Sequence, residues 1–353
     1  MKVVSLDKDH IEFGDTPNPA KGPPKPTDSK LREDCSMKVV VAGQGAFGQR
    51  HLEACAAIPG IEVVSLAGGN PKGTEETAKK YNVPHWTSYN LTESISLPGV
   101  EAVILATPTQ QHHAQALEVM RAGKHVQIEI PMADSLADSQ DICDMQKQTG
   151  LVAMAGHTRR FNPSHQWVHN KIVAGELKLQ QLKAETYFFR RTNMNAAGQP
   201  RSWVDHLLWH HACHTVDLFQ YQTGEEISVA RGVQGPINPE LDIAMDMSVQ
   251  LKAPGGAICT LSLSFNNKGM QGTFFRYICD NGTYVAYYDD LYDGDVKEGA
   301  KIDLSGVAVS TNGIELQDRE FFAAINEKRE PNASVHQALS AMRALDTIEK
   351  SLA

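Results

Sequence analysis

Residues 38–48 read KVVVAGQGAFG and decide how the N-terminal half of the chain folds. An apolar segment, residues 39–41, runs into Gly43, Gly45 and Gly48, which have G-x-G-x-x-G spacing. A strand, a glycine turn and a helix in this order form a phosphate-binding element, because the glycines let the backbone turn tightly and approach a pyrophosphate. Free amides at the start of the helix then face the anion. We expect a dinucleotide site here, although a glycine turn that binds nothing is the competing interpretation.

Apolar strands and helical segments keep alternating from residue 37 to residue 156, which predicts a parallel sheet covered on both faces. Ligands of such sheets bind at the carboxyl ends of the strands. Four of these ends carry short unusual sequences, which ordinary turn chemistry also favours but which together indicate one shared site. The candidate cofactor-binding residues are Gly43, Gly45, Ala46, Phe47, Gly48, Gly68, Gly69, Lys72, Thr107, Pro108, Thr109, His112, Glu129 and Pro131.

The pattern changes after residue 156 to longer strands with period-2 alternation, as in residues 245–251 and 261–265. Asn281-Gly282 between two apolar runs is a strong hairpin signal. We predict an α+β domain over residues 157–330, built on a large, mostly antiparallel open sheet and used for substrate binding and oligomerisation. Helices expected at residues 163–173 and 206–222 can cover one face, so the other favours a homodimer or homotetramer. Residues 331–353 are expected to form a helix that packs back on the first domain.

Composition narrows the function. The chain has 353 residues and a net charge of −9, the wrong sign for following a nucleic-acid backbone. Six scattered cysteines without a C-x-x-C pair predict a reducing, cytoplasmic compartment and no thiolate zinc site. No apolar run approaches the roughly 18 residues of a membrane span. Residues 1–36, with five prolines between residues 15 and 29, are expected to form a flexible extension.

The densest group of ionisable side chains is residues 203–217, WVDHLLWHHACHTVD. If this segment is helical, His206, His210 and His214 lie four residues apart on one stripe, with Asp217 a further turn along. A histidine there can accept a proton at neutral pH while a carboxylate orients it, so His210, His214 and Asp217 are the catalytic candidates. Two alternatives remain: imidazoles hydrogen-bonded in the core, and a zinc site, for which no third ligand is evident.

Arginines gather around the same segment. Guanidinium groups bind carboxylates in a bidentate manner, so several of them predict a small substrate with more than one carboxylate, and surface ion pairing is the alternative. The substrate-binding candidates are His157, Arg159, Arg160, Arg190, Arg191, Arg201, His206 and His211.

Several of these motifs occur in the order typical of one family. The glycine turn, Thr107-Pro108-Thr109 before His112, residues 123–126 (GKHV), Glu129-x-Pro131 and residues 214–217 (HTVD) resemble the glucose-fructose oxidoreductase, inositol dehydrogenase and MocA family. The resemblance implies a Rossmann domain, an α+β domain with an open sheet and a nicotinamide cofactor. From residue 37 nearly to the end the chain is most similar to members that use NADP to oxidise the hemiacetal of an aromatic ring-cleavage semialdehyde to a pyrone dicarboxylate.

Three departures from the family pattern bear on mechanism. Glu129-Ile130-Pro131 replaces the Glu-Lys-Pro of the sugar dehydrogenases, and His210 stands where many relatives have an aspartate, which favours a histidine-based proton route. Residues 67–72 (AGGNPK) contain no acid to bind the ribose hydroxyls of NAD, so NADP is expected, held by Lys72 or backbone amides, and NAD use stays open. A sugar or polyol dehydrogenase and a non-catalytic NADP sensor are the alternative functions.

Overall fold

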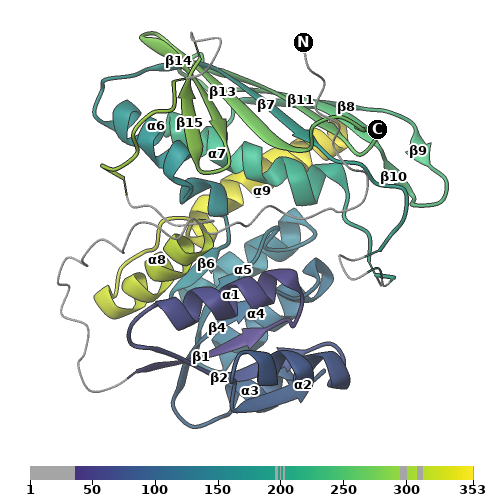
Figure 1. Cartoon of the computed structure of the whole chain (residues 1–353), viewed down its shortest axis with the longest axis vertical. Coiled ribbons are helices and arrows are strands. Elements are labelled where there is room, and N and C mark those ends of the chain that lie inside the picture. Colours follow the sequence, from purple (N-terminus) through teal and green to yellow (C-terminus); the bar gives the residue numbers. More distant parts are fainter. Residues whose placement is uncertain are drawn as a thin grey trace, which may run out of the picture. The chain divides into compact units, whose positions relative to one another are not determined.

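The computed structural model describes residues 36–194, 198, 200–201, 203–294, 300–307 and 313–352. Two sheets organise this part of the chain, one of six strands and one of seven (Figure 1). The expected N-terminal extension lies outside the described residues apart from Ser36.

The six-stranded sheet is parallel and has the order β3-β2-β1-β4-β5-β6. Its strands are β1 (Met37–Ala42), β2 (Ile61–Gly68), β3 (His85–Ser88), β4 (Val100–Leu105), β5 (His125–Ile128) and β6 (Ala153–Ala155). Its helices are α1 (Ala46–Ala57), α2 (Pro71–Lys80), α3 (Leu91–Ile95), α4 (His112–Arg121) and α5 (Leu136–Thr149). The central strands are buried on both faces, which explains why β1 and β4 are apolar almost throughout. The predicted Rossmann domain is confirmed.

The seven-stranded sheet has the order β15-β14-β13-β7-β12-β11-β8. Its strands are β7 (Leu179–Tyr187), β8 (Val229–Gln234), β11 (Asp246–Lys252), β12 (Ile258–Ser264), β13 (Gly272–Cys279), β14 (Gly282–Tyr287) and β15 (Asp290–Asp293). The β7–β12 pair is parallel and the other neighbouring pairs are antiparallel. The mostly antiparallel sheet is therefore confirmed, including the hairpin at Asn281-Gly282. A two-stranded ribbon, β9 (Ile237–Asn238) and β10 (Ile243–Ala244), stands apart.

One face of the seven-stranded sheet carries the helices α6 (Pro163–Val173), α7 (Cys213–Thr223) and α9 (Val335–Ser351) (Figure 1). Alternate strand residues such as Met247, Val249 and Leu251 are buried on this face, and Ser248 and Gln250 between them are exposed. Helix α9 also packs on α5 of the first domain, and α8 (Ile314–Glu327) packs on α1. Helix α9, which also packs on α7 and β8, therefore contacts both domains.

The segment from His206 differs from the regular helix that its histidine spacing predicts. His206 itself is extended, with φ −119° and ψ 162°, and a π-helix (Leu207–Ala212) precedes α7. The expected single stripe is therefore wrong, because a π-turn widens the helical period. Two short 3-10 turns, Thr109–Gln111 and Thr158–Arg160, follow β4 and β6. In the residues that the structure describes, no helix is both long and apolar enough to cross a membrane.

Candidate active site

The glycine turn after β1 has the geometry that phosphate binding requires. Gly43 has φ +117°, and a Cβ there would come within 2.2 Å of the Ala106 carbonyl oxygen. A Cβ on Gly48 would meet the Gly43 oxygen at 1.8 Å, whereas the same addition at Gly45 meets nothing within 4 Å. Gly45 is also the N-cap of α1 and no side chain caps the helix. The turn thus leaves open space beside free amides, which suits a pyrophosphate.

The end of β2 is shaped by Gln44. Its Oε1 accepts a hydrogen bond from the Gly69 amide at 2.7 Å, and a Cβ on Gly68 would meet that oxygen at the same distance. Asn70 caps α2 by accepting from the Gly73 amide. Lys72 in the first turn of α2 is 88% exposed in its side chain, with Nζ 3.9 Å from a Glu76 oxygen. The polar groups at this edge that lie near an expected ribose are the Gly69 amide, the Gln44 carboxamide and the Lys72 side chain.

The ends of β4 and β5 are joined through His112. Its Nδ1 lies 2.9 Å from the Pro131 carbonyl oxygen and its Nε2 lies 2.8 Å from the Thr107 carbonyl oxygen. The imidazole is buried and burial lowers its pKa. His112 therefore fixes the spacing of the two strand ends that the sequence assigns to the cofactor site, and it presents neither nitrogen to a ligand.

Glu129, a predicted cofactor contact, belongs to a buried ionic cluster. His51 on α1 lies between two carboxylates: its Nδ1 is 2.9 Å from Asp318 Oδ2, and its Nε2 is 3.2 Å from Glu129 Oε1. Gln127 and Gln317 donate to Asp318 and Glu129 respectively. Burial alone would lower the pKa of His51, but the two carboxylates raise it to about 10. His51 is therefore an imidazolium that holds Glu129 at the strand edge.

His210 is the point where the second domain touches the strand edge of the first. Its Nε2 lies 3.3 Å from Thr109 Oγ1, and its Nδ1 accepts the His206 amide N–H at 3.2 Å. Since Nδ1 is the acceptor, the neutral ring carries its proton on Nε2 and donates it to Thr109. Burial and the nearby His206 lower the pKa of His210 to about 3. Neither nitrogen of His210 has a free lone pair.

His214, in the first turn of α7, differs from His210 because its Nδ1 is enclosed without a hydrogen-bond partner. Burial, and after it the charge of Arg159, hold its pKa well below the usual value. The imidazole is therefore neutral at neutral pH and has an unused ring nitrogen. A neutral imidazole with a free lone pair is what a general base needs.

Asp217 does not contact His214 through any hydrogen bond found in the described structure. Its carboxylate receives Nε and Nη2 of Arg160 at 2.8 and 2.6 Å, and His157 Nδ1 lies 3.5 Å away. The remaining donor of Arg160 contacts Asn332 and Gln337. Although burial would raise it, Arg160 and His157 hold the pKa of Asp217 below its usual value. This geometry does not support Arg160 as a substrate ligand or Asp217 as the partner of the base.

Arg159 has the opposite environment. Its Nε is buried without a partner, and its one hydrogen bond to the described residues is a long contact of 3.5 Å from Nη1 to Asn162 Oδ1. Within the described residues no carboxylate lies at ion-pair distance. The guanidinium carbon is 5.8 Å from the centre of the Phe275 ring and 5.7 Å from that of Tyr288. A cation desolvated in this way attracts an anion from outside the chain.

Asp205 forms ion pairs with three of the other basic residues that the sequence assigns to substrate binding. It forms ion pairs with Arg190 on both oxygens, with Arg201 at 2.9 Å and with His211 at 3.3 Å. Two guanidinium groups on one carboxylate leave an excess of one positive charge. Arg191 lies apart from this cluster and donates to the Arg190 carbonyl oxygen.

In the part of the chain that the structure describes, the histidines at residues 206–214 do not form a trio of metal ligands. Among the described residues one group of three, His113, Asp138 and Asp141, brings its ligand atoms within 4.8 Å of one another, and it lies on α4 and α5. The three histidines at residues 206, 210 and 214 do not meet this criterion. The geometry gives no support to the zinc alternative.

Sequence reasoning missed five residues that shape the site: His51, Asp318, Asp205, Tyr288 and Gln44. His51 and Asp318 are separated by 267 positions, so no spacing could join them. Asp205 is within the histidine-rich segment and its charge was a usable signal. Tyr288 gives no signal in the sequence, because the feature that sets it apart is its positive backbone φ, which only the structure shows.

Comparisons with known proteins agree with this architecture. Residues 37–157 match the model of the oxidoreductase family with an NAD-binding Rossmann fold, and residues 163–308 match that of the bacterial oxidoreductase C-terminal domain. A relative from Sphingobium sp., 4-carboxy-2-hydroxymuconate-6-semialdehyde dehydrogenase, is 60% identical over 316 residues, which cover 90% of this chain and 99% of the relative. A scyllo-inositol 2-dehydrogenase from Bacillus subtilis is 25% identical over 56% of each chain.

Solved structures show the same fold at low sequence identity. A levoglucosan dehydrogenase in complex with NADH superposes with a TM-score of 0.79 at 19% identity, covering 90% of this chain and 96% of that one. An Agrobacterium radiobacter oxidoreductase in complex with NAD+, L-tartaric acid and magnesium has a TM-score of 0.77 at 15% identity over the same shares. With its two matched domains and its 60% identical relative, the chain belongs to the glucose-fructose oxidoreductase, inositol dehydrogenase and MocA family of NAD(P)-dependent oxidoreductases.

Proposed function

We propose that this enzyme oxidises the cyclic hemiacetal of 4-carboxy-2-hydroxymuconate-6-semialdehyde to the lactone 2-pyrone-4,6-dicarboxylate, with NADP+ as oxidant. The 60% identical relative carries this substrate in its name. One observation on this chain supports the same substrate class: Arg159 is a partly buried cation whose Nε has no partner, no carboxylate lies at ion-pair distance from it in the described structure, and it lies close enough to lower the pKa of His214. A substrate that carries both a carboxylate and a hydroxyl group matches this pair, because the cation can bind the carboxylate and the neutral base can accept the hydroxyl proton.

The chain's residues divide the work as follows. Arg159 binds one substrate carboxylate, and the excess charge of Arg190 and Arg201 attracts the other. His214, whose imidazole is neutral and whose side chain is partly exposed, takes the hydroxyl proton as the C–O bond becomes a carbonyl. A nicotinamide cofactor, when bound, would supply the hydride acceptor, so the hemiacetal loses a hydride from this carbon and one proton to His214. His210 donates to Thr109 and positions the strand edge.

Proton acceptance by His214 becomes easier when the substrate is present. In the free enzyme the Arg159 charge lowers the proton affinity of the imidazole. A carboxylate paired with Arg159 cancels that charge, so the base gains strength when the correct substrate is bound. A neutral sugar would not provide this effect, which argues against the sugar or polyol dehydrogenase.

The proposed preference for NADP rests on the end of β2. A carboxylate at this position binds the ribose hydroxyls of NAD and repels the NADP phosphate. The chain has Gly68 and Gly69 there, with Gln44 hydrogen-bonded to the Gly69 amide and Lys72 exposed nearby. A phosphate can be bound by Lys72 and the first turn of α2.

The test is turnover by the purified enzyme with NADP+ and the hemiacetal, followed by absorbance of the reduced cofactor and identification of the lactone. Replacement of Arg159 by Gln should raise KM for the hemiacetal about 10- to 100-fold, the loss expected for a charged hydrogen-bonded pair. The control is Arg191→Gln, an exposed arginine outside the Asp205 cluster, which should change KM little. Faster turnover of inositol or glucose than of the hemiacetal would overturn the proposal.

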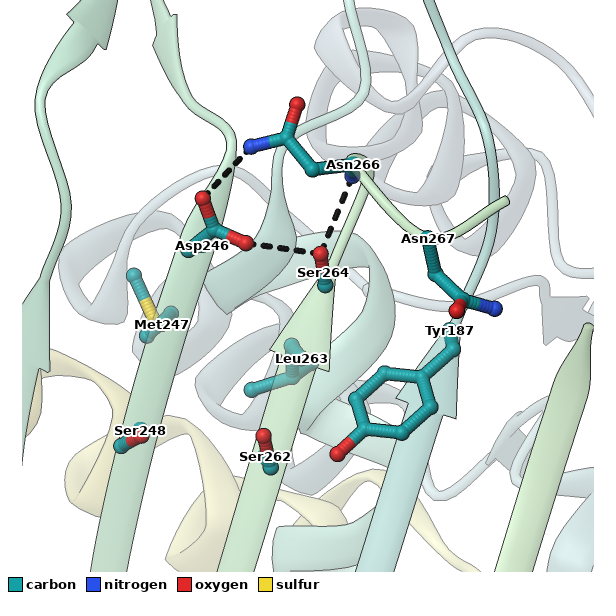
Figure 2. A pocket seen from close by; sticks show the side chains of 9 residues that line it. All are labelled: Tyr187, Asp246, Met247, Ser248, Ser262, Leu263, Ser264, Asn266 and Asn267. Carbon is teal, nitrogen blue, oxygen red and sulfur yellow. Dashed lines mark hydrogen bonds between the residues drawn. The ribbon is translucent and has the colours of Figure 1, made fainter. Parts of the chain in front are cut away.

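We also propose that the enzyme is a homo-oligomer in which the uncovered face of the seven-stranded sheet meets a partner subunit. Ser248, Ser262 and Ser264 lie on this face, around a hollow near the ends of β7, β11 and β12 (Figure 2). Asp246, Ser264 and Asn266 are hydrogen-bonded along its edge. Small hydroxyl side chains leave room for a second sheet to approach.

A further inference from the structure

Tyr288 occupies a backbone position that is unfavourable for tyrosine. It is the first of two residues that join β14 to β15, and its φ is +51°. Hairpins of this length normally place glycine or asparagine where φ is positive, because a side chain with a bulky Cβ is strained there. The strain is on the order of 1–2 kcal/mol. A tyrosine kept where glycine or asparagine is preferred indicates that its side chain has a functional role.

Neighbouring residues hold the strained turn in place. Ser164 Oγ donates to the Tyr288 carbonyl oxygen at 2.5 Å, and Asn162 Nδ2 donates to Asp289 Oδ1 at 2.6 Å. Gly272 on β13 leaves space for the ring, since a Cβ there would come within 2.9 Å of the Tyr288 hydroxyl. Asn162 is also the residue that Arg159 contacts. Asn162 therefore links the turn to Arg159, because it forms hydrogen bonds with both.

The Tyr288 ring packs edge-on against Tyr287, with 4.7 Å between the ring centres, but this contact leaves part of the side chain exposed. Tyr288 is 37% exposed, whereas Phe275, the other ring near Arg159, is 1% exposed. The two rings lie at nearly equal distances from the guanidinium carbon, 5.7 and 5.8 Å. Arg159 therefore lies near one buried ring, Phe275, and one partly exposed ring, Tyr288. An aromatic wall on the solvent side keeps water from the cation and strengthens its attraction for an anion.

We propose that Tyr288 is a specificity-determining residue, which encloses Arg159 and donates its phenol hydroxyl to the carboxylate that Arg159 binds. The inference rests on the proposed dicarboxylate substrate and adds a second donor to the same carboxylate. Burial raises the pKa of Tyr288, so the phenol stays protonated and is able to donate at neutral pH. The flat ring also favours a planar pyrone or hemiacetal ring over a puckered sugar.

The experiment measures binding of 2-pyrone-4,6-dicarboxylate to the NADP-loaded enzyme by titration calorimetry, with thermal unfolding of each variant alongside. Tyr288→Phe removes the hydroxyl alone and should weaken binding about 10-fold. Tyr288→Asn removes the ring as well and should weaken binding about 100-fold, whereas the thermal midpoint should stay level or rise, because asparagine tolerates positive φ. A purely structural tyrosine would give a lower midpoint.

The matched control is Tyr89→Asn. Tyr89 is also a tyrosine with positive φ, +58°, and it is 80% exposed at the end of β3. Its replacement should relieve strain in the same way and leave dicarboxylate binding unchanged. Three results would each overturn the inference. Both Tyr288 variants could bind within twofold of wild type, the thermal midpoint could fall in parallel with binding, or the wild type could fail to bind the dicarboxylate. Tight dicarboxylate binding without any hemiacetal oxidation would instead contradict the proposed function alone.

Discussion

Replacement of His51 by Gln should destabilise the protein far more than removal of any surface ion pair. His51 is fully buried between Asp318 and Glu129, with nitrogen–oxygen distances of 2.9 and 3.2 Å. Its pKa rises from 6.5 to about 10. Since each tenfold change in proton affinity corresponds to about 1.4 kcal/mol, the folded state favours the imidazolium by roughly 5 kcal/mol. Breaking a buried pair commonly costs about 3–5 kcal/mol, and we expect a loss in that range.

The pH dependence gives a second, independent signature of the same cluster. A histidine whose pKa is raised on folding contributes its full stabilisation below about pH 6.5, the unfolded value, and loses it as the pH approaches 10. Between about pH 7 and 10, the free energy of unfolding of the wild type should therefore fall more than that of His51→Gln. Of the two carboxylates that face His51, Glu129 has a pKa that His51 holds below its usual value, whereas burial raises the pKa of Asp318. The difference between wild type and variant therefore reports the whole cluster.

The assay is urea unfolding of wild type and variant at several pH values. Lys79→Gln is the control, because the Lys79–Glu75 pair is exposed and spans one helical turn. It should cost less than about 0.5 kcal/mol at any pH. The reasoning is refuted if His51→Gln costs less than about 1 kcal/mol at neutral pH, or if its stability falls with alkaline pH as steeply as that of wild type.

Four further predictions concern activity and assembly. His214→Asn should lower kcat about 100-fold or more without weakening NADP binding in a fluorescence titration, and near-normal turnover would exclude it as the base. Because the pKa of His214 lies well below its usual value, kcat/KM in a pH profile should stay level through neutral pH and fall only below about pH 6.5. Gly69→Asp should shift the kcat/KM ratio toward NAD, and Lys72→Ala should raise KM for NADP alone; equal effects on both cofactors would contradict the proposed phosphate site. Ser262→Glu, on the uncovered sheet face, should reduce the mass found by light scattering from oligomer to monomer, and an unchanged mass would place the interface elsewhere.

The strand pattern predicted the fold well because buried strands and glycine turns are local features. The apolar β1 and the glycine turn after it could be assigned from a few residues, and Asn281-Gly282 fixed a hairpin by turn chemistry alone. The short strands β3 and β6 carry too few apolar residues for this kind of recognition.

The candidate site was predicted less completely, because the partners of a charged side chain depend on tertiary packing. Arg159 and Arg160 are neighbours in sequence, yet Arg160 is saturated by Asp217, Asn332 and Gln337 while Arg159 has one long contact. Nothing in the sequence distinguishes them, since the distinction comes from residues more than 50 positions away. The π-helix was equally invisible, because a helical period of 3.6 was the natural assumption for the histidines.

The most direct test of the central claim is a crystal structure of the ternary complex with NADP and 2-pyrone-4,6-dicarboxylate. Our account predicts one product carboxylate on the Arg159 guanidinium and the Tyr288 hydroxyl, with the His214 imidazole at hydrogen-bond distance from the oxygen that becomes the lactone carbonyl. A carboxylate bound elsewhere while Arg159 stays unpaired, or His214 turned away from the reacting oxygen, would contradict it.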